Sequence, residues 1–287
     1  MFKFFFNFFD FKRKKKNIYF IDSLEDWKYF VKSLRSETQI GIDTEFDWRT
    51  TYFPKICLIQ ISTSDKIFIL DCVTFNIPKE FKLILENKSI LKVFHSVRSD
   101  STVLSKCLNV NVQNVYDIQQ AEKMISKGEI QNYGFIVEKY LKISLSKSET
   151  NSNWLRRPLS ESQIKYAAED VDFLLKIFSK QKKYLSDAQL KKVFELSDFE
   201  SSLGKEKLLN SRLKKKEKKY NKKEKEIFIW REKLAEIENV PPNYIFKEKH
   251  IPFLAKNDCK NISDHKKKLL RILGNSHYVE KFILNFK

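Results

Sequence analysis

Three short apolar segments near the start of the chain most constrain its fold. They cover residues 39–46, 56–62 and 66–70, and turn-forming or polar residues separate them. Short segments rich in β-branched residues and bounded by turn residues are typical of β-strands. We therefore expect an antiparallel meander in this part of the chain.

Strand and helix patterns alternate around this meander. A strand at 18–21 and a helix at 23–34 precede it, with Ser23 as the expected N-cap. A strand at 91–95, a helix at 97–108, a short extended segment at 115–117 and helices near 121–125 and 135–141 follow it. Residues 144–159 are polar and irregular, and Ser160 with Gln163 predicts a capping box that opens a long helix through about Tyr184. This ordering predicts an α/β fold with helices flanking a mixed sheet.

The pattern beyond Ser186 is helical throughout. A lysine-rich stretch at 213–225 leads into a helical segment at 227–237, and Pro, Asn and Gly separate the later apolar segments. Short helices of this kind predict a small all-α bundle. We expect a leader at 1–17, an α/β domain at 18–185, a helical linker at 186–210 and a helical domain at 211–287.

The charge of the chain favours a polyanionic partner. Lys and Arg number 55 against 37 Asp and Glu, which gives a formal charge of +18. Such an excess of positive charge attracts nucleic acid, and it would equally attract an anionic membrane. A third explanation needs no partner, because all proteins of an organism with a lysine-rich proteome are basic. No segment reaches the roughly 18 apolar residues that a membrane helix needs, so stable membrane insertion is not expected. The Phe-rich leader has its aromatic run before its basic run, unlike an export signal, and we interpret it as a segment without a fixed structure rather than as a weak anchor.

The cysteines argue against a zinc site and against a disulfide framework. Cys57, Cys72, Cys107 and Cys259 are widely spaced and include no C-x-x-C pair. This usage favours a reducing, cytoplasmic location.

Two acidic residues stand inside the extended segment QIGIDTEF. Side chains alternate across a strand, so Asp43 and Glu45 project from one face. The other face carries Ile40, Ile42 and Thr44. Two carboxylates on one face repel each other, and at a buried site a cation between them relieves the repulsion. An exposed edge strand with two acids is the alternative, so the pair alone is a weak sign of a metal.

Two later elements carry further acids. Asp100 lies in the first turn of the helix that follows the strand ending at His95, where the helix dipole by itself accounts for many acids. Tyr166 and Asp170 are four residues apart and stack on one helical face, beside the small Ala167. Taken alone, a helical Tyr and Asp most often form a local hydrogen bond.

In this order and spacing, the three elements resemble the motifs of the ribonuclease D family of DEDD-type exonucleases. Those motifs are D-x-E, an Asp that begins a helix after a strand, and Tyr-x-x-x-Asp. The flanking sequence is similar too, in DTEF with YFPKICLIQIS, in FHSVRSD and in KSETNSNWLRRPLSESQIKYAAEDV. The resemblance covers about residues 18–185, and Lys165 stands where a sister subgroup has a His, so the chain is similar to the tyrosine subgroup.

The resemblance implies an RNase H-like exonuclease domain and a 3′→5′ exoribonuclease activity that releases nucleoside 5′-monophosphates. It also implies two divalent cations, Mg²⁺ or Mn²⁺, because sites built from oxygen ligands favour hard ions. Asp43 would bridge both ions, with Glu45 and Asp170 completing the first site and Asp100 the second. Tyr166, with an ordinary pKa of about 10, would orient the attacking water rather than act as a base.

Six further residues are candidate contacts to the terminal nucleotides, because aromatic rings stack on bases and cations hold phosphates. They are Phe46, His95, Lys147, Trp154, Arg156 and Arg157. The alternatives are a core position for Phe46 or Trp154 and surface ion pairs for the two arginines.

The segments from about Ser211 onward resemble the helicase-and-RNase-D C-terminal (HRDC) domain, a small helical module associated with nucleic-acid binding. The positions that carry this resemblance are Trp230, Asn239, Val240, Pro241 and Gly274. Well-studied relatives carry two such modules, and this chain has room for one. The adjacent lysine run would bind the RNA backbone or form a solvated helix face.

The expected substrate is RNA with a free 3′ end, such as a tRNA precursor, and the expected oligomeric state is a monomer. Two other functions stay open at this point. One is a DNA 3′→5′ exonuclease, and the other is a non-catalytic RNA-binding protein that keeps the fold. The four intact acids argue against the second of these.

Overall fold

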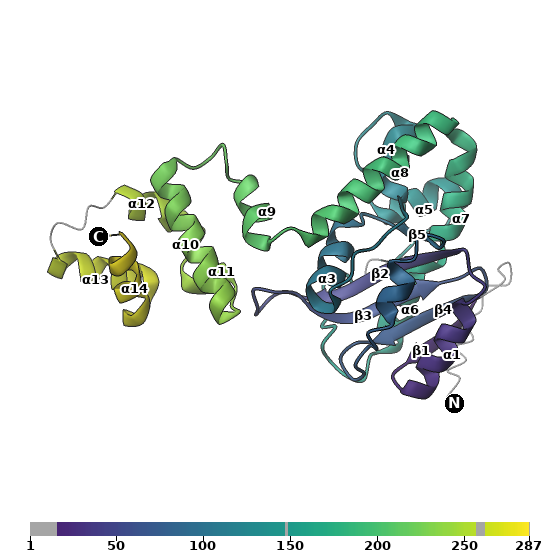
Figure 1. The fold of residues 1–287 in the computed structure, drawn as a ribbon, viewed down its shortest axis with the longest axis horizontal. Helices are drawn as coiled ribbons and strands as arrows, with labels where there is room; N and C mark the ends of the chain where they lie inside the picture. Colours follow the sequence, from purple (N-terminus) through teal and green to yellow (C-terminus); the bar gives the residue numbers. More distant parts are fainter. Residues whose placement is uncertain (1–15, 147–148, 257–261, 287) are drawn as a thin grey trace. The chain divides into compact units, whose positions relative to one another are not determined.

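The computed structural model describes residues 16–146, 149–256 and 262–286 (Figure 1). The chain forms two compact units. The first contains the residues up to Asp47 and Lys55–Lys205, and the second contains Trp48–Pro54 and the residues from Glu206 onward. Residues 1–15 of the predicted leader lie outside the described residues. None of the described helices is long and apolar enough to cross a membrane.

The first unit is built on a six-stranded mixed sheet with the strand order β1-β4-β3-β2-β5-β6. Its strands are β1 (Asn17–Ile21), β2 (Gln39–Asp47), β3 (Lys55–Ser62), β4 (Lys66–Asp71), β5 (Leu91–Phe94) and β6 (Val115–Asp117). Strands β2, β3 and β4 pair antiparallel, and the pairs β1–β4, β2–β5 and β5–β6 are parallel. The predicted meander and the predicted mixed sheet are confirmed.

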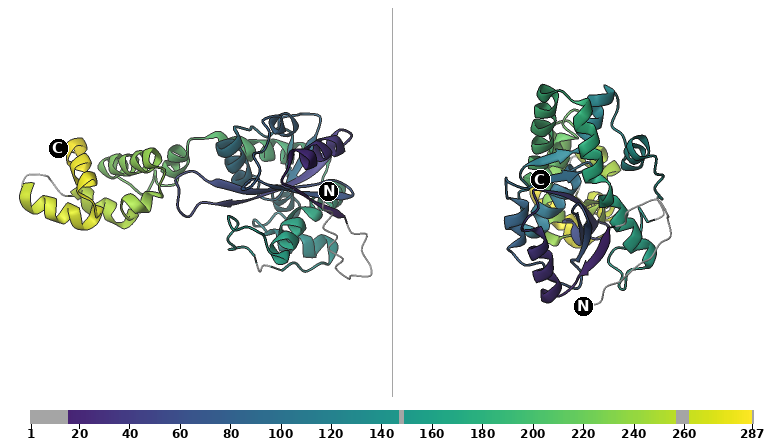
Figure 2. Two further views of the ribbon diagram at one scale, coloured as in Figure 1. Left: turned by 90° about the horizontal axis from the view of Figure 1, so that it is seen from below. Right: turned by 90° about the vertical axis from the view of Figure 1, so that its right-hand side faces the viewer.

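Helices cover both faces of this sheet, as Figure 2 shows in its left-hand view. On one face, buried side chains of α1 (Leu24–Leu34), α2 (Phe81–Leu85) and α3 (Arg98–Leu108) pack against the strands. The opposite face is covered by α4 (Ile118–Ser126), α5 (Tyr133–Leu141), α6 (Glu161–Asp172) and α7 (Leu174–Gln181), and α8 (Asp187–Ser202) lies along β6 and packs Val193 into the same core. The predicted N-cap Ser23 and the predicted capping box of Ser160 with Gln163 are both present.

The long helix predicted through Tyr184 is wrong, because it is broken at Phe173. Helix α6 ends at Asp172, α7 begins at Leu174, and a 3₁₀ turn (Lys182–Tyr184) follows α7. Two hydroxyls from distant segments bind carbonyls at the end of α6: Ser62 Oγ donates to Val171 O at 2.7 Å and Tyr133 Oη donates to Glu169 O at 3.2 Å. Side chains that enter the hydrogen-bond ladder of a helix commonly interrupt it. The break lies next to Asp170, so these contacts also fix the end of α6 that carries it.

Most of the segment predicted as a linker is helix α8 of the first unit. Its Ser197 Oγ accepts a hydrogen bond from Asp117 N at 2.9 Å, and the Asp198 carboxylate accepts one from Val115 N at 3.0 Å. Helix α8 therefore completes the hydrogen bonding of β6, which is an edge strand.

The second unit is a helical bundle. Its helices are α9 (Leu208–Lys214), α10 (Lys222–Glu238), α11 (Pro242–Ile245), α12 (Ile251–Lys256), α13 (Ile262–Leu273) and α14 (Ser276–Phe286). The loop at 48–54 contributes Tyr52, which is fully buried in the core of this unit. Asn239 Oδ1 accepts hydrogen bonds from the backbone N–H groups of Tyr52 and Phe53 at 3.1 and 3.2 Å. A helical C-terminal region is thus confirmed, with a loop from between β2 and β3 as part of it.

Candidate metal centre

Asp43 and Glu45 lie on the part of β2 that extends beyond the end of its neighbour β5. Ile40 and Ile42 are fully buried against the helices of one face, so alternation directs the two acids to the other face. The pairing of β2 with β5 ends at Gly41, and β2 continues beyond it to Asp47. The acids therefore lie where the sheet has no neighbouring strand on that side.

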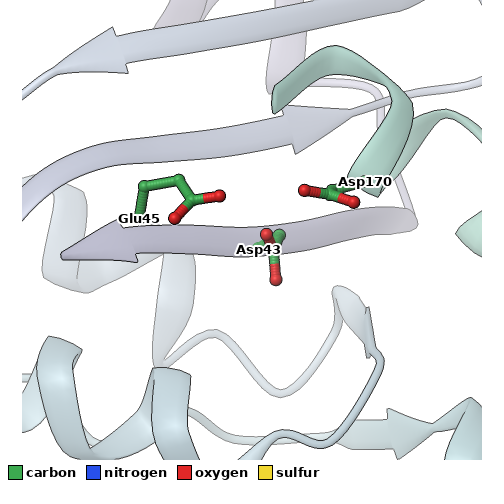
Figure 3. Close-up of side chains that lie close together, drawn as sticks. All are labelled: Asp43, Glu45 and Asp170. Atoms are coloured by element: carbon green, nitrogen blue, oxygen red, sulfur yellow. The ribbon is translucent and has the colours of Figure 1, made fainter. Parts of the chain in front are cut away.

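Helix α6 brings a third carboxylate to this edge. One carboxylate oxygen from each of Asp43, Glu45 and Asp170 lies within 4.8 Å of the other two. Figure 3 shows the three side chains directed toward one another, two from the strand and one from the helix. Such an arrangement of hard oxygen ligands suits a divalent cation.

Burial and mutual repulsion make the ionised form of this cluster costly. Burial is the main cause in each case, and it raises the pKa of Glu45 to about 9, with the Asp170 charge adding to it. Burial raises the pKa of Asp170 to about 8, with a further contribution from Glu169. The pKa of Asp43 is raised well above its ordinary value by burial and by the neighbouring Asp100 and Asp170 charges. A bound cation is the ordinary means of keeping such a cluster ionised near neutral pH.

Asp100 lies beside this group, at the start of α3. Its Oδ1 accepts hydrogen bonds from Thr44 N at 3.1 Å and from Thr44 Oγ1 at 2.6 Å. Thr44 N–H is on the stretch of β2 beyond the β5 pairing, so the carboxylate takes the place of a strand partner. Burial raises the pKa of Asp100 to about 7, against the lowering effect of the Thr44 hydrogen bond. Asp100 is outside the group of carboxylates that lie within 4.8 Å of one another, but its charge raises the pKa of Asp43 and of Glu45.

Asp117 holds the turn that leads into α3, and sequence reasoning missed it. Its carboxylate accepts hydrogen bonds from Ser96 N at 2.9 Å and Val97 N at 3.0 Å, and Ser96 has a left-handed φ of 61°. The side chain is buried at the end of β6. It also caps α4, and an Asp before a helix is the only sequence signal it offers. Asp117 thereby fixes the first turn of the helix that carries Asp100.

Tyr166 lies one turn before Asp170 on α6. Its Oη is 3.4 Å from Thr150 Oγ1, and its ring centroid is 6.1 Å from that of Trp154. Burial raises the pKa of Tyr166 to about 12, and the charges of Asp170 and Glu45 add to this effect. The phenol therefore keeps its proton near neutral pH.

Arg157 and Trp154 both contact other parts of the first unit and stabilise its fold. Arg157 donates to Asp71 Oδ2 from Nε at 2.6 Å, and its other nitrogens donate to Asp71 Oδ1 and to backbone carbonyls, including that of Trp154. Trp154 is 3% exposed and packs in the core of the α6 face. Both residues were predicted to contact nucleotides, and the structure instead shows them in contact with the protein's own core and backbone.

The other predicted contacts are placed differently. Phe46 is half-buried and follows an irregularity in the β2–β3 register between Glu45 and Phe46, and bulges of this kind re-aim side chains beside active sites. His95 Nε2 is 3.1 Å from Gln131 O, and burial lowers its pKa. Arg156 is exposed, and Lys147 lies outside the described residues.

Comparisons with known proteins identify the family of the first unit. A family model described as 3′-5′ exonuclease matches residues 18–186. Ribonuclease D of Bartonella henselae is 30% identical over 257 residues, which is 86% of this chain and 63% of that protein. Ribonuclease D of Desulfotalea psychrophila is 32% identical over 162 residues, which is 56% of this chain and 43% of that protein. The chain thus spans less than two thirds of the length of these relatives.

Solved structures share the fold at lower identity. Escherichia coli RNase D, described as an exoribonuclease involved in structured RNA processing, matches 93% of this chain and 75% of its own with a TM-score of 0.75 and 23% identity. The catalytic core of RRP6 from Trypanosoma brucei matches 94% of this chain and 79% of its own with a TM-score of 0.70 and 23% identity. From its fold, its acidic cluster and the family model that matches its first unit, the chain belongs to the 3′-5′ exonuclease family.

Proposed function

We propose that this protein is a metal-dependent 3′→5′ exoribonuclease that releases nucleoside 5′-monophosphates. The observation that carries the proposal is the convergence of Asp43, Glu45 and Asp170 within 4.8 Å at an open sheet edge. Phosphodiester cleavage by paired cations requires an oxygen-rich site of this kind. The ribonuclease D relatives favour RNA as the substrate.

Each residue of the site has its own role in the proposed mechanism. Bound divalent cations would supply Lewis acidity and a water of lowered pKa at the 3′-terminal phosphodiester. Asp43, Glu45 and Asp170 would hold the ions, with Asp100 as a fourth carboxylate beside them. Tyr166 keeps its proton and orients the attacking water through its hydroxyl.

We further propose RNA precursors with an unpaired 3′ end, such as those of tRNA, as substrates. The test is incubation of a 5′-labelled, 3′-unpaired tRNA precursor with Mg²⁺, with and without chelator, followed on a sequencing gel. A ladder of products shortened one nucleotide at a time from the 3′ end, present only with Mg²⁺, is expected. Faster degradation of single-stranded DNA than of RNA of equal length would assign the protein to the DNA exonucleases instead.

Replacing Tyr166 with Phe is expected to lower kcat by about 10²-fold, which is the scale for loss of one positioned hydrogen-bonding group at a reacting centre. Because the hydroxyl is not a cation ligand in this mechanism, KM for RNA and the affinity for Mn²⁺ should be unchanged. Steady-state kinetics and calorimetric titration with Mn²⁺ measure the two effects. Tyr184→Phe, at an exposed tyrosine in the same unit, is the matched control and should retain full activity.

We propose that the helical unit, with its HRDC-like sequence, adds binding to the RNA backbone. Lys215, Lys218 and Lys222 are exposed, and among the described residues none of them has an ion pair. Their ammonium groups are therefore available to phosphates, and they release counterions when RNA binds.

Changing these three lysines to Ala together should make the dependence of log K for RNA on log salt shallower by about 2, because each phosphate that a lysine neutralises adds about 0.7 to the slope. Turnover at saturating RNA should be unaffected. Fluorescence anisotropy at several salt concentrations measures the slope. The same change at the exposed lysines Lys28, Lys79 and Lys123 of the first unit is the control. An equal decrease in both triple variants would argue against a special role for the helical unit.

A further inference from the structure

Gln60 is a buried residue whose polar atoms have no partner. It lies in the middle of β3 and is 0% exposed. Neither its Nε2 nor its Oε1 has a hydrogen bond among the described residues. Buried amide groups in native proteins are nearly always paired, because an unpaired one destabilises the fold. A fully buried glutamine without a hydrogen bond therefore suggests that its amide gains a partner in another state of the protein.

The position of Gln60 identifies that partner. Gln60 pairs directly opposite Asp43 in the antiparallel β2–β3 ladder. Residues opposite each other in such a pair point to the same face of the sheet, with their Cβ atoms about 4.5–5.5 Å apart. On the other side, Gln60 pairs with Ile69 of β4, which has no polar side-chain atom. Of the two residues directly opposite Gln60, only Asp43 has a polar side chain, so the strand pairing puts the Gln60 amide and the Asp43 carboxyl side by side on one face.

The remaining residues of β3 on this face leave no alternative along the strand. Leu58 is apolar and belongs to the core. Ser62 donates its hydroxyl to Val171 O at 2.7 Å and is committed to the end of α6.

Gln181, a second buried glutamine of the first unit, has hydrogen bonds at both polar atoms of its side chain. Gln181, also 0% exposed, donates from Nε2 to Ile118 O at 2.9 Å, and its Oε1 is 3.4 Å from Tyr116 Oη. Its amide is paired by the polypeptide at both ends. Gln60 differs in this respect, although both residues lie in the core of the same unit.

We propose that Gln60 is a positioning residue of the cation site and donates its amide N–H to the ionised Asp43 carboxylate when cations are bound. This inference rests on the proposed function, because it requires Asp43 to hold cations. Groups that hydrogen bond to a metal-binding side chain fix its orientation and raise its affinity for the ion. This hydrogen bond would pair a buried amide that has no other partner among the described residues.

The test uses the full chain with Gln60→Met, which keeps the side-chain volume and removes the amide. Calorimetric titration of the cation-free protein with Mn²⁺ should show affinity weaker by about 10- to 100-fold, the usual effect of losing such a supporting hydrogen bond. The Tm of the cation-free variant should equal or exceed that of the wild type, because an unpaired buried amide has been removed. Gln60→Leu provides a second apolar replacement if the Met variant folds poorly.

Unchanged Mn²⁺ affinity in both variants would overturn the proposal, as would a lowered cation-free Tm with wild-type affinity. Gln181→Met is the matched control and should show the opposite pattern, a lower Tm with unchanged Mn²⁺ affinity. Wild-type protein and Asp43→Asn complete the set. If the wild type binds Mn²⁺ no better than Asp43→Asn, then the proposed function itself fails. If the wild type binds Mn²⁺ better than Asp43→Asn and the Gln60 variants match the wild type, then the role of Gln60 alone is refuted.

Discussion

Asp43→Asn is expected to reduce metal-dependent nucleotide release by about 10³-fold or more. Asp43 stands at the centre of the cluster, where its carboxylate is repelled by those of Asp100, Asp170 and Glu45. Loss of a carboxylate that would hold the cations removes several kcal/mol of transition-state stabilisation, and each 1.36 kcal/mol is about a factor of ten in rate. Single-turnover kinetics on a labelled RNA at saturating Mg²⁺ measures the loss.

The same change should raise the Tm of the cation-free protein. An amide carries no charge, so the substitution relieves repulsion among buried carboxylates while nearly keeping the shape of the side chain. Glu129→Gln, at an exposed acid of the same unit, is the control and should change neither rate nor Tm. Full activity of Asp43→Asn would mean that the acidic cluster is not the reactive centre.

The cation-free protein is expected to lose stability as the pH rises from about 5 to about 9. The pKa values of Asp100, Asp170 and Glu45 are raised to about 7, about 8 and about 9. In the unfolded chain the same carboxyls titrate near pH 4, so between these values the folded state binds more protons than the unfolded state. The stabilisation is complete below the unfolded pKa and is lost as the pH rises through the folded values. The loss is on the order of a few kcal/mol for the cluster, because solvent screens the partly exposed Glu45 and Asp170.

Thermal melts in chelator and in Mg²⁺ at pH 5, 7 and 9 measure this dependence. Because cations bind the deprotonated carboxylates, the Tm gained on adding Mg²⁺ should increase with pH. Glu45→Gln removes one of the titrating groups and should flatten the decline in chelator. A Tm that is constant over this range in chelator, or a Mg²⁺ effect that is largest at pH 5, would contradict the raised pKa values.

The sequence predicts those features of the site that depend only on neighbouring residues in the chain. Strand alternation is sufficient to place Asp43 and Glu45 on one face, and helical spacing is sufficient to stack Tyr166 on Asp170. Their approach in space depends on the order of the strands, which no local pattern encodes, so it could be expected only from the resemblance to a known family.

Features that depend on distant residues could not be predicted in this way. At the break near Phe173, two helix carbonyls accept hydrogen bonds from the hydroxyls of Ser62 and Tyr133, which are far from it in sequence. Gln60 looks like an ordinary strand residue until its pairing with Asp43 is known. Asp117 has the sequence signal of a helix cap, and its second task, fixing the turn before α3, becomes visible only in three dimensions.

The loop at 48–54 determines how the protein has to be divided for study. Since Tyr52 is enclosed by the core of the helical bundle, a gene shortened after Lys205 would encode the first unit with an aromatic loop stripped of its cover. Exposed aromatic surface of this kind promotes aggregation. In an isolated fragment of the first unit, these residues should therefore be replaced by a short polar turn that joins Asp47 to Lys55. Without this replacement, activity lost through aggregation could be misread as evidence that catalysis requires the helical bundle.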